Sequence, residues 1–223
     1  MRQTRRVTLG FLLAYGLCVA RLGYGQEAAP VPAPAPAAGV AAGDTPPPPA
    51  LVKVLVHTSL GDIQLALEQE RAPLTVSNFL RYVDVKRFDG SDFYRAVKIG
   101  DEGKYGLVQG GLHGNPKRVF KPVAHESPRV TGLSHTSGAV SMARTDPGTA
   151  TADFFIVVGD LVALDGQPTG EDLGYAVFGH VSDGMDVVRS ILDQPTSPDA
   201  GDGAMKGQMI AAPVKIISIR RVD

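Results

Sequence analysis

The sequence contains 223 residues with a formal net charge of −1, and 43% of its residues are hydrophobic. The near-zero charge argues against a nucleic-acid-binding protein, and this hydrophobic content excludes a chain that is disordered throughout. Cys18 is the single cysteine, which excludes an intrachain disulfide and a cysteine-based metal site.

Residues 1–25 are typical of a signal peptide. Three arginines lie within 2–6, and an apolar run of fourteen residues follows at 7–20. Such a run is too short for a comfortable membrane span but has the length of the apolar region of a signal peptide. We therefore expect export of the protein, with an uncleaved N-terminal anchor as the alternative. Contact with a membrane is expected only through such an uncleaved signal.

Residues 26–50 predict a disordered linker. The segment consists almost wholly of Ala, Pro, Gly and Val, and it ends in four consecutive prolines at 46–49. This composition cannot bury enough apolar surface to fold, and its prolines favour an extended chain. The segment is interpreted as a tether for the folded domain.

The folded domain is expected over residues 51–223, and its first element is a β-hairpin. Apolar residues alternate along 53–58 and along 62–67, and a Ser-Leu-Gly-Asp turn separates the two runs. The period then changes to helical spacing, which predicts a helix over 72–83. Pro73 is compatible with the first turn of that helix.

Short strands separated by glycine-rich turns dominate the middle of the chain, and one helix follows them. The strands are expected at 92–97, 107–110, 138–143, 154–158 and 176–181, with a final strand at 214–219. The second helix is predicted over 183–192, with Ser182 or Asp183 as its N-cap. This pattern favours a mainly β fold, a closed barrel capped by two helices, over the alternative of a two-sheet sandwich.

The motifs of hydrolases, metalloenzymes and nucleotide-binding proteins are missing from the sequence. Its five histidines lack the spacing of a zinc site, and the sequence contains no G-x-S-x-G elbow. The glycine-rich run at 109–114 lacks the lysine of a P-loop. We therefore expect no metal and no cofactor.

Six short motifs occur in an order and at spacings that resemble the cyclophilin family of peptidyl-prolyl cis-trans isomerases, especially its exported bacterial branch. They are F-Y-R-A-V at 93–97, V-Q-G-G at 108–111, V-S-M-A-R at 140–144, A-D-F-F-I at 152–156, A-L-D-G at 163–166 and Y-A-V-F-G-H-V at 175–181. The resemblance covers about 53–222. It implies a closed eight-stranded antiparallel β-barrel capped by two helices, with the active site on the outer face of the barrel.

The resemblance also implies roles for individual residues. The family's catalytic arginine falls on Arg95 and its glutamine on Gln109. Its substrate-binding positions fall on Leu107, Ala143, Arg144, Asp153, Phe155, Leu164 and Tyr175. Phe155 is expected to form the wall of the proline pocket, and the backbone around Arg144 is expected to hold the peptide.

The sequence departs from the family pattern between Arg95 and Gln109. This stretch is several residues longer than usual and contains Gly100–Lys104 as an insertion. One aromatic wall of the pocket is missing, and we expect Tyr105 or Leu107 to replace part of it. Asp153 stands where the family has a glutamine, and its charge is expected to favour basic peptides.

The favoured function is therefore acceleration of X-Pro isomerisation in exported proteins, which assists their folding in the periplasm. The expected partners are proline-containing segments of unfolded or folding exported proteins, and the expected state is a monomer. The alternative is a non-catalytic chaperone or assembly module of the cell envelope that binds proline-containing segments. A third reading is a structural envelope protein tethered by 26–50.

Overall fold

The structure, a computed structural model, describes residues 50–100 and 103–222. The predicted signal peptide and the predicted linker up to residue 49 lie outside the described residues. Strand β1, the first described element, begins at Val52.

The described chain contains nine strands, three α-helices and two 3₁₀ helices. In chain order the elements are β1 Val52–Thr58, β2 Gly61–Leu67, α1 Pro73–Asp84, β3 Ser91–Ile99, β4 Tyr105–Gly111, α2 Pro128–Thr131, β5 Ala139–Met142, β6 Phe154–Val158, η1 Val162–Asp165, β7 Val177–Asp183, α3 Met185–Leu192, β8 Thr196–Ser197, η2 Gly203–Met205 and β9 Met209–Val222.

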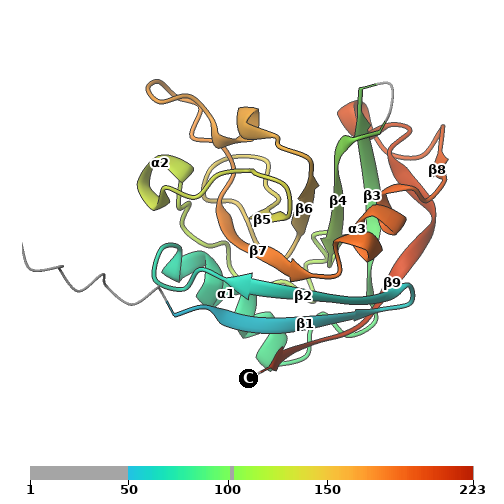
Figure 1. The fold of residues 1–223 in the computed structure, drawn as a ribbon, viewed down its shortest axis with the longest axis horizontal. Helices are drawn as coiled ribbons and strands as arrows, with labels where there is room; N and C mark the ends of the chain where they lie inside the picture. The colour runs from blue at the N-terminus through green and yellow to red at the C-terminus, as the bar shows by residue number, and fades with distance from the viewer. Residues whose placement is uncertain (1–49, 101–102, 223) are drawn as a thin grey trace, which may run out of the picture. The chain divides into compact units, whose positions relative to one another are not determined.

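The strands form a closed antiparallel barrel (Figure 1). Their order is β1-β2-β7-β5-β6-β4-β3-β9, and β9 returns to pair with β1 from Lys53↔Val222 to Thr58↔Ile216. The two-residue strand β8 pairs only with β9 and stands outside the closure. This arrangement confirms the eight-stranded barrel, and closure removes the exposed sheet edges on which other chains could pair.

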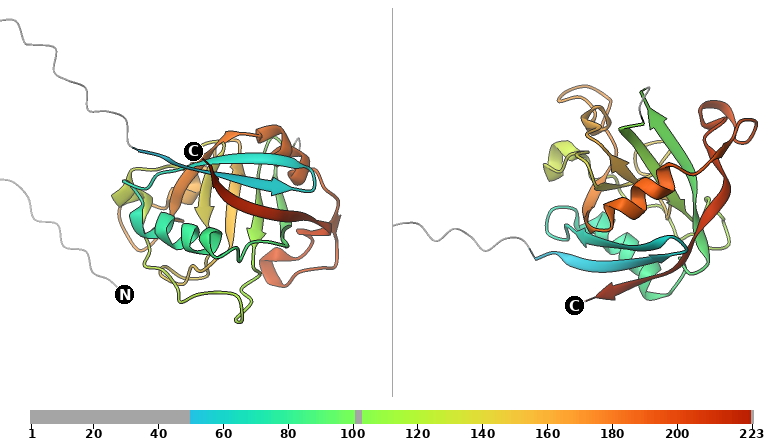
Figure 2. Two further views of the ribbon diagram at one scale, coloured as in Figure 1. Left: turned by 90° about the horizontal axis from the view of Figure 1, so that it is seen from below. Right: turned by 45° about the vertical axis from the view of Figure 1, so that its right-hand side comes forward.

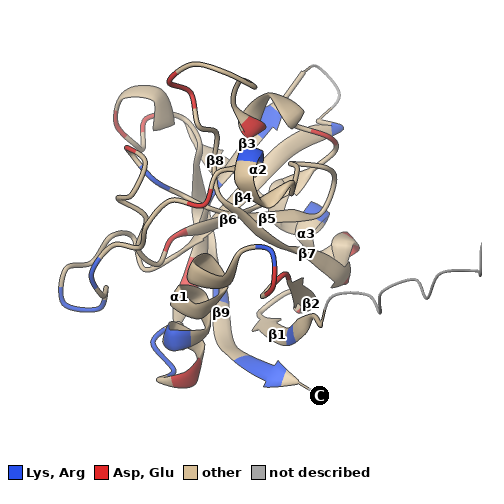
Figure 3. Cartoon of the chain, turned by 90° about the vertical axis from the view of Figure 1, so that its left-hand side faces the viewer, with Lys and Arg blue, Asp and Glu red and all other residues tan. Residues whose placement is uncertain are grey.

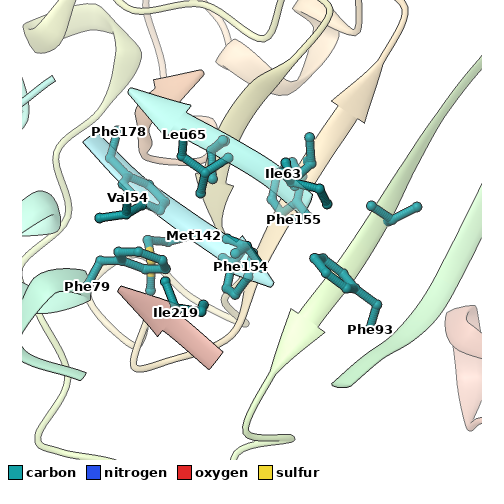
Figure 4. Close-up of a cluster of buried hydrophobic side chains, with 14 of the residues drawn as sticks. Val54, Ile63, Leu65, Phe79, Phe93, Met142, Phe154, Phe155, Phe178 and Ile219 are labelled. Atoms are coloured by element: carbon teal, nitrogen blue, oxygen red, sulfur yellow. The ribbon is translucent and has the colours of Figure 1, made fainter. Parts of the chain in front are cut away.

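The interior of the barrel is filled by aromatic and aliphatic side chains (Figure 4). Phe154 lies at its centre and is fully buried; its ring centroid is 5.4 Å from that of Phe79 and 5.8 Å from that of Phe93, both in edge-to-face contact. The ring of Phe178 lies 5.2 Å from Phe79. Because side chains alternate along a strand, the neighbours of these core residues point away from the interior.

Helices α1 and α3 lie at opposite ends of the barrel (Figure 2). Helix α1 buries Val76, Phe79, Leu80 and Val83, the helical stripe seen in the sequence. Neither Ser182 nor Asp183 caps α3, and this is a correction. Strand β7 runs on to Asp183, and Gly184 is the N-cap, since its positive φ of 86° permits the sharp turn between strand and helix.

The segment 118–137, for which the sequence predicted no structure, packs against α1. Helix α1 begins after Ala72, which offers no side-chain cap. Glu126 supplies the cap instead: its carboxylate accepts hydrogen bonds from the backbone N–H of Leu74 (3.1 Å) and of Thr75 (2.7 Å). An anion is stabilised there by the helix dipole. The single-turn helix α2 follows in the same segment.

Within residues 50–100 and 103–222, no helix is long and apolar enough to cross a membrane.

Strand β9 is longer than the sequence predicted, and ion pairs hold its end to the region of α1. Arg221 pairs with Asp84 at 2.7 Å, and Arg220 pairs with Asp89 at 2.6 Å. Figure 3 shows basic residues at the end of α1 and along the end of β9. The side chains of both pairs are 35–49% exposed, and solvent screens pairs at such positions, so we expect them to contribute little to the free energy of unfolding.

Candidate active site

An open cavity of about 580 Å³ lies on the outward face of β3, β4 and β6. Gln109 and Phe155 reach it because each is the sequence neighbour of a core residue, Val108 and Phe154, and therefore points the opposite way. The expected residues that the structure brings to this cavity are Arg95, Leu107, Gln109, Ala143, Arg144, Asp153, Phe155 and Tyr175.

A β-bulge in β3 gives Arg95 its position. Phe93 pairs with Gly110, but Arg95 pairs with Gln109, so Tyr94 is an extra residue in the ladder with β4. The ladder with β9 shifts at the same place. A bulge bends the strand and changes the direction of the following side chains. Gly110 is required opposite the bulge, because a Cβ there would lie 2.8 Å from the Phe93 ring.

Hydrogen bonds fix the guanidinium of Arg95 at the cavity. Its Nη1 donates to Oε1 of Gln109 at 2.8 Å, and its Nε and Nη2 donate to Oε1 of Gln208 at 2.9 and 2.6 Å. The amide nitrogen of Gln109 donates in turn to the Tyr94 hydroxyl at 2.6 Å. Gln109 therefore presents its oxygen to the arginine and its nitrogen to the tyrosine, and its orientation is determined by these two partners.

Arg95 and Tyr94 keep their protons in this environment. Burial lowers the pKa of the Arg95 guanidinium, but arginine starts so high that it stays charged. Burial raises the pKa of the Tyr94 hydroxyl, and the neighbouring charge of Asp153 raises it further. The cavity thus contains a charged N–H donor beside a neutral phenol.

Phe155 forms an apolar wall between two other rings. Its ring stacks on His135, with centroids 5.8 Å apart and planes inclined by 10°. It meets Tyr175 edge to face at 5.5 Å. Aromatic pairs at these distances favour such offset and T-shaped arrangements. Phe155 is only 4% exposed, so its position is determined by packing on both sides.

His135 supports Phe155 from inside the protein. It is fully buried, and its Nδ1 lies 2.5 Å from Asp165 while its Nε2 lies 3.0 Å from the Ser141 hydroxyl. Burial lowers the pKa of His135, although the hydrogen bond to Asp165 opposes this shift. A neutral ring that donates to Asp165 and accepts from Ser141 satisfies both contacts.

Asp153 lines the cavity, and its carboxylate also holds the turn after β4. Its Oδ1 accepts from the backbone N–H of His113 and its Oδ2 from that of Gly114, both at 2.8 Å. The turn needs glycine at Gly111, whose φ is 135° and where a Cβ would lie 2.5 Å from Asp153. The expected preference for basic peptides stays a prediction.

The side chain of Arg144 closes over the rim of the cavity. Its guanidinium lies 4.6 Å from the centroid of the Tyr175 ring, a cation–π geometry. It also donates to the backbone oxygens of Gly174 and Thr145. Arg144 therefore restrains Tyr175 through its side chain, whereas only its backbone was expected to take part in the site.

Comparison with known proteins identifies the family. Residues 53–221 match the family described as cyclophilin type peptidyl-prolyl cis-trans isomerase. This chain is a cyclophilin-type isomerase. It is 36% identical over 174 residues to a peptidyl-prolyl cis-trans isomerase of Acinetobacter baylyi. This match covers 77% of this chain and 87% of the relative. It is 41% identical over 148 residues to peptidyl-prolyl cis-trans isomerase A of Dickeya dadantii, covering 64% of this chain and 72% of the relative.

A solved structure agrees with the cyclophilin fold. A cyclophilin type peptidyl-prolyl cis-trans isomerase of Cryptosporidium parvum superposes with a TM-score of 0.59 at 21% identity. The match covers 78% of this chain and 99% of that protein. The activity of this cyclophilin is peptidyl-prolyl cis-trans isomerisation, a reaction of the X-Pro bonds in proline-containing peptides.

The structure does not bring Tyr105 or Leu164 to the cavity, and this corrects the expected set of lining residues. Tyr105 begins β4, four residues before Gln109, and it lies against Gly159 with its ring 48% exposed. The insertion at Gly100–Lys104 forms the connection between β3 and β4, and its residues 101 and 102 lie outside the described part. The Leu164 carbonyl accepts from the N–H of Tyr175 at 2.9 Å, so its backbone positions a cavity residue.

Replacement of Tyr105 by alanine is accordingly expected to leave turnover unchanged, within about twofold. Leu107→Ala, which removes a side chain that does line the cavity, is expected to raise KM. The two variants are compared by steady-state kinetics with a proline-containing peptide. A loss of turnover in Tyr105→Ala alone would assign the missing aromatic wall to Tyr105 after all.

Several cavity residues were not predicted. They are Tyr94, His113, Gly114, Thr145, Thr149, Thr151, Met205 and Met209. Tyr94 lies within the F-Y-R-A-V motif at 93–97, and period-2 alternation along this strand, combined with the bulge, is the signal that could have indicated it. No element was predicted over 199–208, and no local signal indicated that Gln208 would contact Arg95.

Proposed function

We propose that Arg95 is the catalytic group of this cyclophilin and that Gln109 and the apolar cavity walls hold the substrate around it. The observation that carries the proposal is the guanidinium of Arg95, which is directed by hydrogen bonds at the cavity where Phe155 forms the wall. The charged donor of Arg95 suits the amide nitrogen of a substrate proline, and the aromatic surface of Phe155 suits the proline ring.

The chemistry follows from the amide bond. An X-Pro bond rotates slowly because of its partial double-bond character, with a barrier of about 18–20 kcal/mol. In the twisted state the prolyl nitrogen becomes pyramidal and its lone pair can accept a hydrogen bond. A donor from Arg95 interacts with this twisted state and barely with the planar one, so it lowers the barrier by differential binding. The step needs no nucleophile and no cofactor.

The cavity walls divide the substrate into a fixed and a rotating part. Phe155, Leu107 and Tyr175 hold the pyrrolidine ring, while Gln109 and the backbone near Arg144 hold the acyl side by hydrogen bonds. A cyclophilin of Cryptosporidium parvum has been solved in the presence of the dipeptide Ala-Pro, which supports a proline-containing peptide as the ligand here. The residues that line the described cavity include all the groups to which this mechanism assigns a role, and the proposed acting state is a monomer.

The clients are proline-containing segments of unfolded or folding exported proteins in the periplasm. The basic and apolar start of the chain, followed by the Ala/Pro-rich segment, supports export. The isomerase fold and family favour catalysis over the non-catalytic binding module considered as the alternative.

Export is tested with a bacterial reporter. Residues 1–50 fused to alkaline phosphatase are expected to give activity, because this enzyme needs the disulfides that form outside the cytoplasm. Fractionation and the mass of the mature fusion then locate the cleavage. An inactive fusion that stays in the cytoplasm, beside an active control with an established signal peptide, would overturn the proposed localisation.

A further inference from the structure

Gln208, in the segment before β9, is the second residue that accepts hydrogen bonds from the guanidinium of Arg95. Oε1 of Gln208 accepts from Nε of Arg95 at 2.9 Å and from Nη2 at 2.6 Å. Oε1 of Gln109 accepts from Nη1 at 2.8 Å. Two amide oxygens therefore hold the planar guanidinium by hydrogen bonds to different nitrogens. One belongs to Gln109 on the neighbouring strand, and the other to Gln208, 113 positions from Arg95 in the sequence.

Gln208 contacts Arg95 from behind the cavity. Its neighbours Met205 and Met209 line the substrate cavity, whereas Gln208 lines a separate hollow between β3 and the segment that follows α3. A residue in this place reaches the substrate only through Arg95.

The chemistry of the contact suits this task. A guanidinium presents five N–H donors in a rigid fork, and the two glutamines occupy three of them. Within the described part of the chain, the other two donors remain for a ligand. Both glutamine oxygens are neutral, so they orient the fork without cancelling its charge, as a carboxylate would.

The backbone of Gln208 has partners of its own. Its carbonyl accepts from the N–H of Ala96 at 3.0 Å, and its N–H donates to the Met205 carbonyl at 3.1 Å. These bonds hold the segment in place whatever side chain stands at position 208. The side-chain amide is thus free to serve Arg95 alone.

We propose that Gln208 is a positioning residue for isomerisation, which directs the Arg95 guanidinium toward the prolyl nitrogen. The proposal rests on the proposed catalytic role of Arg95. Without the second acceptor, rotation about the last torsions of the arginine side chain points the two remaining donors away from the substrate. The loss falls on the transition state, because the planar ground state makes little use of these donors.

The test replaces Gln208 by methionine, which has a similar length and no amide oxygen. We expect kcat to fall about tenfold with KM within about twofold of wild type. The Arg95 Nε–H signal in ¹⁵N NMR spectra is expected to exchange faster with water. Gln69→Met, at an exposed position after β2, serves as the control and is expected to match wild type in kcat, KM and melting temperature.

A double-mutant cycle separates this inference from the role of Arg95 itself. In an Arg95→Ala background, Gln208→Met is expected to cause no further loss of kcat. An equal tenfold loss in both backgrounds, or a rise in KM with unchanged kcat, would overturn the positioning role and leave Arg95 as the catalytic group. Wild-type turnover in Arg95→Ala would instead overturn the proposed function of Arg95.

Discussion

Replacement of Arg95 by alanine is expected to lower kcat for X-Pro isomerisation by about 10²–10³-fold, the range seen when one preorganised donor to a transition state is removed. The reason is that the guanidinium is the charged donor that Gln109 and Gln208 hold at the cavity. Turnover is measured with a proline-containing peptide and, independently, as acceleration of a proline-limited refolding reaction.

Two further variants sharpen this result. Arg95→Lys keeps the charge but cannot grip both glutamines with a rigid fork, so it is expected to recover only a small part of the turnover. Arg189→Ala removes an exposed arginine on α3 and is expected to match wild type. Equal rates for wild type and Arg95→Ala, at equal melting temperatures, would rule out the mechanism.

Phe154→Ala is expected to lower the free energy of unfolding by about 3–5 kcal/mol, because the ring is fully buried and its loss leaves a cavity in the barrel. Phe154 contacts the rings of Phe79, Phe88 and Phe93, and none of these lines the active-site cavity. Turnover per folded molecule is therefore expected to stay close to wild type. Denaturation by urea and steady-state kinetics measure the two quantities separately.

Phe155→Ala is expected to affect turnover more than the free energy of unfolding, the reverse of Phe154→Ala. One face of this ring lines the cavity, so kcat/KM is expected to fall tenfold or more through the lost proline wall. Its contacts with His135 and Tyr175 are also lost, and the free energy of unfolding is expected to fall by less than in Phe154→Ala. Indistinguishable effects of the two substitutions on stability and turnover would contradict the division of β6 into a core face and a site face.

The secondary structure followed closely from local patterns where one face of an element is buried. The hairpin β1–β2 and the helix α1 were predicted within one or two residues, because period-2 and period-3.6 spacing record which side chains face the barrel. The segment 118–137 showed no such period. Its order comes from tertiary contacts, among them the cap that Glu126 places on α1.

The residues of the cavity also divide into those that short sequence motifs predicted and those that only contacts between distant segments revealed. Motif register was enough to propose Arg95, Gln109 and Phe155, which do line one cavity. It misplaced Tyr105, because spacing along β4 does not reveal how far the cavity extends. It also gave no role to Gln208, which lies 113 positions from the arginine that it contacts.

The sequence by itself determined the mainly β fold, the resemblance to the family and the choice of Arg95 as the catalytic candidate, since the strand pattern and the six motifs consist of residue types at short spacings. Only the tertiary structure decided where that arginine points. A bulge at Tyr94 sets the direction of the side chain, and acceptors from two distant segments hold its guanidinium. A hydrogen bond depends on distance and angle in space, and sequence separation determines neither.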